Sequence, residues 1–132
     1  MKSLLFAGLI IIAFISGYYL FRPANIQLAT VDVNRFHQLT ADPNAVIIDV
    51  RTPEEFTAGH LDRAVNSDFY DQTQFPRFLD SLNKNNRYLL YCRSGNRSRQ
   101  ARKLMEEKGF TKVSDLDGGI TAWQAANLPL IK

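Results

Sequence analysis

The feature that most constrains this chain is its alternation of short apolar runs with helical segments after residue 27. Residues 45–50 (AVIIDV) and 87–92 (RYLLYC) are nearly continuous apolar runs of strand length, which is typical of strands buried on both faces. Weaker strand signals lie near residue 29, at 63–67 and at 112–119. Helical segments at 31–42, 52–56, 73–83, 98–109 and 120–129 separate them. This order predicts one α/β domain with a mainly parallel sheet covered by helices on both faces.

Two helix starts can be predicted from local sequence. Asp32 precedes a segment with apolar residues on one helical face and is the expected N-cap. Thr52 is followed by Pro53 and, three residues after the cap, by Glu55. That spacing is a capping box with proline at its favoured position.

Residues 1–24 form a separate hydrophobic segment. Lys2 is followed by an apolar run over residues 4–21, which ends at Arg22 and Pro23. As a helix the run would be about 27 Å long, close to the roughly 30 Å hydrocarbon core of a bilayer. We favour a retained single-pass membrane anchor, because the segment lacks a good small-residue cleavage motif. A cleaved signal peptide remains the alternative.

The positive-inside rule favours the N-terminus in the cytoplasm and residues 25–132 outside it, in the periplasm of a bacterial cell. The preference is small because Lys2 and Arg22 lie on opposite sides of the run. Secretion after cleavage, and a domain that faces the cytoplasm, both stay open.

The charge of the chain is small overall and concentrated locally. The formal net charge is +3, which does not fit a nucleic-acid-binding domain. Between Ser81 and Met105, however, there are seven basic residues and no acidic one. The single cysteine, Cys92, lies within this stretch. One cysteine cannot form an internal disulfide, and with two histidines it makes a poor zinc site.

The position of Cys92 favours a reactive thiol. It follows a buried strand, and ligands of α/β sheets bind at the carboxyl ends of strands. The next helix is expected to begin near Ser98, and Gly95 permits the tight curl between them. Inward-facing amides, a helix N-terminus and nearby arginines would all favour the thiolate. The spacing from Cys92 to Arg97 is one residue shorter than in phosphate-binding Cys-x5-Arg loops, so a persulfide fits better than phosphate.

Three stretches carry a resemblance to a known family. The loop YCRSGNRS, the stretch IIDVRTPEEFTAGHL and the C-terminal stretch LDGGITAWQAANLPL resemble, in this order, the signatures of single-domain rhodaneses. The resemblance implies a rhodanese-like three-layer α/β sandwich over residues 25–132, with a five-stranded parallel sheet, preceded here by one hydrophobic helix. Two departures are Arg63 and Asn127, which stand where the family often has glycine.

The resemblance also implies the chemistry. Cys92 would be the nucleophile, accepting sulfane sulfur from thiosulfate or a persulfide and passing it to a thiol or cyanide, without a metal or organic cofactor. The substrate-binding residues would be those of the loop: Arg93, Ser94, Gly95, Asn96, Arg97 and Ser98. Asp49 and Arg51 would be supporting residues, with Arg51 paired to Glu55. For Arg97, pairing with an acid instead of substrate stays open.

Other interpretations compete. The domain could be a sulfur-carrier module that docks on a membrane partner and turns thiosulfate over slowly, with a protein as sulfur acceptor. A phosphatase or arsenate reductase of the same fold would need the longer loop. His60 could be a general base, but an ionised thiol needs none, so we expect a structural role. Trp123 is expected to pack in the core.

Overall fold

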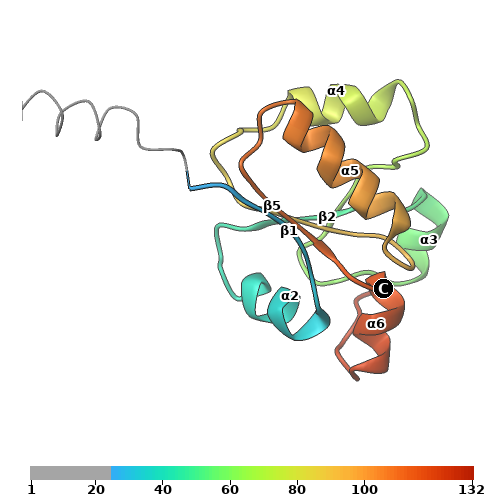
Figure 1. Cartoon of the computed structure of the whole chain (residues 1–132). Coiled ribbons are helices and arrows are strands. Elements are labelled where there is room, and N and C mark those ends of the chain that lie inside the picture. The colour runs from blue at the N-terminus through green and yellow to red at the C-terminus, as the bar shows by residue number, and fades with distance from the viewer. Residues whose placement is uncertain (1–24) are drawn as a thin grey trace, which may run out of the picture.

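The structure is a computed structural model and describes residues 25–132. Strands and helices alternate along the chain as expected (Figure 1). The elements are β1 (Gln27–Val31), α2 (Val33–Thr40), β2 (Val46–Asp49), α3 (Pro53–Ala58), β3 (Val65–Asn66), α4 (Gln74–Asp80), β4 (Tyr88–Tyr91), α5 (Asn96–Glu107), β5 (Lys112–Leu116) and α6 (Gly119–Ala125).

The five strands form one sheet in the order β1-β5-β4-β2-β3, and every neighbouring pair is parallel. The predicted five-stranded parallel sheet is therefore confirmed. Strand β4, which leads into Cys92, is the central strand, with Ile48 of β2 opposite Leu90 on one side. Because the strands are parallel, all their carboxyl ends lie along one edge, where the residues that follow them meet.

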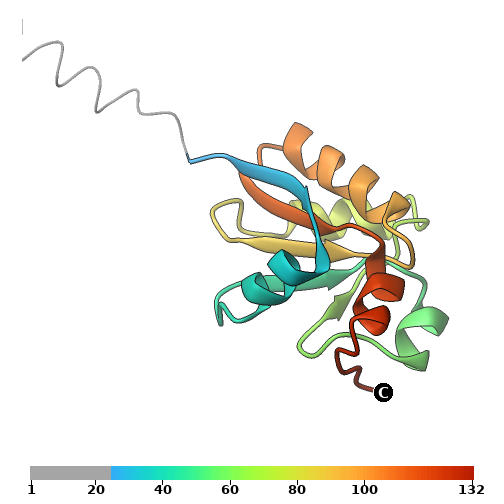
Figure 2. The ribbon, with the colours of Figure 1, turned by 60° about the horizontal axis from the view of Figure 1, so that its bottom comes forward.

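Helices cover both faces of the sheet (Figure 2). On one face α4 and α5 pack Phe75, Leu79 and Met105 against the strands, in a cluster that includes Cys92. On the other face α2 and α6 contribute Phe36 and Trp123 to a second cluster. The chain is thus the three-layer sandwich that the sequence predicts.

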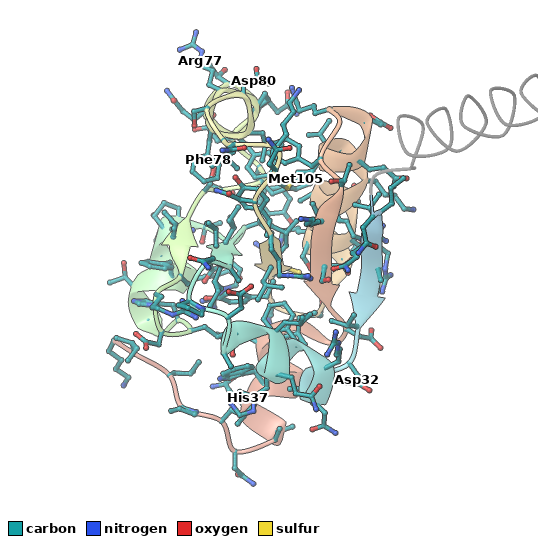
Figure 3. The ribbon with its side chains drawn as sticks, turned by 90° about the vertical axis from the view of Figure 1, so that its left-hand side faces the viewer. Asp32, His37, Arg77, Phe78, Asp80 and Met105 are labelled. Carbon is teal, nitrogen blue, oxygen red and sulfur yellow. The ribbon has the colours of Figure 1, made fainter. Side chains whose placement is uncertain are left out.

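Both predicted helix caps are present. The Asp32 carboxylate accepts a hydrogen bond of 2.8 Å from the Arg35 amide at the start of α2, where Figure 3 labels it. At α3, Thr52 and Glu55 form the complete capping box. Each side chain satisfies an amide that the first helical turn leaves without a partner.

The predicted hydrophobic segment, residues 1–24, lies outside the described residues. Within residues 25–132, no helix has both the length and the apolar character needed to cross a membrane. The prediction of a membrane anchor or signal segment therefore rests on the sequence alone.

Candidate functional site

The carboxyl edge of the sheet brings the predicted site residues together. Cys92 directly follows β4, and Asp49 ends the neighbouring strand β2. The loop after Cys92 turns at once into α5, which begins at Asn96, two residues before the predicted start. The earlier start follows from Gly95, which takes the left-handed conformation (φ 106°) at the N-cap and completes the turn in fewer residues.

Hydrogen-bond donors converge on the sulfur of Cys92. The Gly95 amide donates to Sγ at 3.1 Å, and the Ser98 hydroxyl lies 3.5 Å from Sγ. Gly95 is the N-cap of α5, and Ser98 is in its first turn. The positive end of a twelve-residue helix therefore lies beside the sulfur.

The thiol is buried, with 1% of the residue exposed. Burial raises the pKa of Cys92, but hydrogen bonds from the Ser98 side chain and from the amides of Ser98, Gly95 and Ser94 lower it. The net pKa lies below the usual value of a thiol. Donors that stabilise a thiolate against the cost of burial are the arrangement that a nucleophilic cysteine needs.

The start of α6 supports the loop from behind. The Cys92 carbonyl accepts a 2.8 Å hydrogen bond from the Ile120 amide, and the Arg93 carbonyl accepts from the amide and hydroxyl of Thr121. Gly119 packs so closely that an added Cβ would lie 2.5 Å from both carbonyl oxygens. Sequence reasoning missed this role, although the Gly118-Gly119 pair in the C-terminal stretch could have indicated it.

Arg97 pairs with an acid, the alternative that the sequence left open. Its guanidinium makes two hydrogen bonds to the Glu55 carboxylate, at 2.8 and 3.0 Å. It also lies over the ring of Tyr70, 5.1 Å from the centroid. The roles of Glu55 and Tyr70 in the site were not predicted, and contact between Arg97 and substrate stays a prediction.

Asp49 and Arg51 form a buried pair beneath this edge. The Arg51 guanidinium binds the Asp49 carboxylate at 2.7 Å and the Gly59 carbonyl at 2.7 Å. The prediction that Arg51 pairs with Glu55 is wrong. The Glu55 carboxylate instead binds Arg97 and the Thr52 amide. The pair ties the end of β2 to the turn after α3, which is a structural position.

The remaining loop residues lie at the surface. Arg93, Ser94 and Asn96 are exposed. They belong to the loop that follows Cys92 and to the start of α5, and their contact with substrate stays a prediction.

His60 and Trp123 occupy the structural positions expected of them. The His60 ring stacks on Phe56, with ring centroids 3.9 Å apart, and its Nδ1 lies 2.9 Å from the Leu61 carbonyl oxygen. Trp123 packs on the sheet face opposite the Cys92 cluster and donates to the Pro129 carbonyl. In residues 25–132, no three His, Cys, Asp or Glu side chains are grouped so as to hold a metal ion.

Removing the Ser98 hydroxyl is expected to slow the reaction of Cys92 with iodoacetamide at pH 7 by roughly two- to tenfold. This factor corresponds to the net free energy of one hydrogen bond, about 0.5–1.5 kcal/mol. Ser98→Ala takes away the largest of the effects that lower the pKa of Cys92. Less thiolate is then present, and the pH midpoint of alkylation moves upward. Ser94→Ala is the matched control, because Ser94 stabilises the thiolate through its backbone amide, which the substitution keeps. Equal midpoints for wild type and Ser98→Ala would contradict the assignment.

Comparisons with known proteins agree with this geometry. A family model, the rhodanese-like domain, matches residues 32–126. The chain is 31% identical over 97 residues to the thiosulfate sulfurtransferase GlpE of Shewanella oneidensis, covering 74% of this chain and 93% of that protein. It is 33% identical over 90 residues to a tRNA uridine(34) hydroxylase of Pelagibacter ubique, covering 68% of this chain and only 30% of that protein.

A solved structure shows the same fold. The Alr3790 protein from Anabaena aligns with a TM-score of 0.65 and 29% identity, over 76% of this chain and 81% of that one. The similarity to relatives of such different lengths means that the matched region is the domain they share.

Proposed function

Because the chain belongs to the rhodanese-like domain family, we propose that it is a sulfurtransferase that carries sulfane sulfur as a persulfide on Cys92. One observation carries the proposal. The Gly95 amide and the Ser98 hydroxyl face a sulfur at the N-terminus of α5. These donors stabilise a negative charge on the thiolate, and the inward-facing amides of the same loop would stabilise the charge on the terminal sulfur of a persulfide.

The reaction has two steps. The Cys92 thiolate attacks the outer sulfur of thiosulfate, a new S–S bond forms, and sulfite leaves with the electron pair of the bond that breaks. An acceptor thiolate or cyanide then attacks the terminal sulfur and regenerates the Cys92 thiolate. The negative charge is conserved in both steps, so neither needs a metal or an oxidant.

Mass spectrometry and turnover together test the proposal. After incubation with thiosulfate and gel filtration, the protein is expected to gain the mass of one sulfur atom, and cyanide is expected to remove it as thiocyanate. Steady-state thiocyanate formation distinguishes an enzyme from a sulfur-carrier module, which would load once and turn over slowly. If the protein gains no sulfur from thiosulfate or from an organic persulfide, it is neither a sulfurtransferase nor a sulfur-carrier module. Hydrolysis of an aryl phosphate would favour the phosphatase alternative.

We extend the proposal to location, on the sequence alone. Residues 4–21 would anchor the chain in the membrane with the domain outside the cytoplasm. A reporter enzyme that is active only outside the cytoplasm, fused after Lys132, is expected to be active and to sediment with membranes. Activity in the soluble fraction would indicate cleavage of the segment, and an inactive reporter would indicate a cytoplasmic domain.

A further inference from the structure

The proposed reaction needs the sulfur of Cys92 to meet a donor, yet the residue is 1% exposed. The pKa of Arg97 is raised mainly by its hydrogen bonds to Glu55 and in smaller part by the charge of Cys92, so Arg97 and Cys92 lie within electrostatic reach of each other. Arg97 is in the first turn of α5, directly after the loop that surrounds the sulfur. The groups that hold Arg97 therefore determine how much positive charge a sulfur donor meets beside Cys92.

Arg97 is held by groups from two other elements. Glu55, in the first turn of α3, binds the guanidinium with two hydrogen bonds. Tyr70, in the segment between β3 and α4, lies under the guanidinium and is itself 62% exposed. The Arg97 side chain is 11% exposed and that of Glu55 is 30% exposed. A paired, bidentate and partly buried guanidinium presents little uncompensated charge.

Glu55 remains ionised across the working pH range. Hydrogen bonding to Arg97 is the largest cause that lowers the pKa of Glu55, to about 2. The same carboxylate also accepts the Thr52 amide at 3.0 Å in the capping box. Its position is therefore fixed by the start of α3, and its charge opposes both the Cys92 thiolate and any anion that approaches Arg97.

We propose that Glu55 is a positioning residue that sets the charge selectivity of the site, by holding Arg97 in a neutral pair that an anionic sulfur donor must take over. A donor with oxyanion oxygens next to its transferable sulfur can replace the Glu55 carboxylate on Arg97. A neutral donor has no group with which to do so. This inference rests on the proposed function, and it means that the Glu55 carboxylate limits the affinity of the wild-type site for anionic donors.

Glu55→Gln tests the inference in the full-length protein. Glutamine can still accept the Thr52 amide in a capping box, so α3 keeps its start while the negative charge is lost. The KM for thiosulfate is expected to fall about tenfold with kcat within about twofold, because Arg97 is then free to bind the sulfonate. Glu54→Gln is the matched control. Glu54 lies in the same helical turn and carries the same charge, but the ion pair of Arg97 is with Glu55.

Alkylation gives a readout that does not depend on sulfur transfer. The Cys92 thiolate displaces iodide from either iodoacetate, an anion, or iodoacetamide, which is neutral and of similar size. In Glu55→Gln the ratio of the iodoacetate rate to the iodoacetamide rate is expected to rise about tenfold, because an uncompensated guanidinium attracts only the anion. Taking the ratio cancels any change in the fraction of thiolate. Glu54→Gln is expected to keep the ratio within about twofold of wild type.

The outcomes separate the two proposals. An unchanged ratio in a Glu55→Gln protein with the wild-type unfolding temperature would overturn the selectivity role. If alkylation by both reagents becomes faster by the same factor, Glu55 only blocks access to the sulfur, and the selectivity role is overturned as well. If the ratio rises but the wild-type protein transfers no sulfur, the proposed function fails while the role of Glu55 stands. If Glu55→Gln unfolds at a lower temperature, Arg97→Gln is measured as well, and its ratio must fall below that of wild type for the proposal to survive.

Discussion

Cys92→Ser is expected to abolish thiocyanate formation from thiosulfate and cyanide, with a loss on the order of a thousandfold or more. The described structure presents one sulfur nucleophile at this site, with the Gly95 amide and the Ser98 hydroxyl facing it. A serine hydroxyl is not ionised at neutral pH and cannot form the S–S bond on which the transfer depends. Thiocyanate measured as its iron complex reports the loss directly.

The serine variant also tests whether the loss is chemical or structural. Serine is slightly smaller than cysteine and can accept the Gly95 amide, so the unfolding temperature is expected to change little. A folded Cys92→Ser protein that gains no sulfur from thiosulfate would place the persulfide on Cys92. A variant that keeps more than a few per cent of wild-type turnover would show that sulfur travels by another route.

The elements of the fold could be predicted because their signals are local. Strands β2 and β4 are continuous apolar runs, and the caps at Asp32 and Thr52 depend on residues three positions apart. Arg63 and Asn127, which stand where the resemblance often places glycine, both have left-handed backbones, with φ values of 63° and 57°. A resemblance that aligns them with glycine therefore predicts their conformation as well as their place.

The parts of the site that sequence reasoning missed depend on contacts between distant residues. Glu55 is a good cap residue, and that local signal accounts for its presence without indicating that its carboxylate also binds Arg97, forty-two positions away. The pairing of Arg51 was wrong because Glu55 is bound by the distant Arg97 and because Asp49, only two residues before Arg51, is the nearer carboxylate. Glu55 is nearby in sequence, but the geometry at the end of β2 places the Asp49 carboxylate against the guanidinium. Tyr70 has no local signal at all, since an exposed aromatic residue in a loop is common.

The role of Gly119 was also missed, because it depends on the lack of a side chain where two distant segments come into contact. Its φ is 56°, and the space that a Cβ would need is filled by the carbonyl oxygens of Cys92 and Arg93. The Gly118-Gly119 pair indicates a close backbone approach, but it does not identify the segment that is approached, because the two segments are far apart in sequence. The close approach lets the Ile120 and Thr121 amides reach those carbonyls, and so holds the loop in the shape that surrounds the sulfur.

Gly119→Ala is therefore expected to destabilise the protein by about 2–5 kcal/mol and to remove most sulfur transfer. A left-handed non-glycine residue costs about 1–2 kcal/mol, and relief of a backbone overlap in a packed region adds about 1–3 kcal/mol. The loop must then move away from α6, which displaces the donors around Cys92. Chemical denaturation gives the free energy of unfolding, and iodoacetamide reactivity reports the state of the thiol.

Gly109→Ala is the matched control for Gly119→Ala. Gly109 also has a left-handed backbone, with φ 93°, but an added Cβ there would meet only the Lys84 side chain, at 3.9 Å. It should lose about 1–2 kcal/mol from backbone strain alone and keep wild-type turnover. If the two variants lose the same stability and both stay active, the contact between Gly119 and the loop carbonyls does not shape the site. If only Gly119→Ala loses activity, the start of α6 is part of what positions the sulfur.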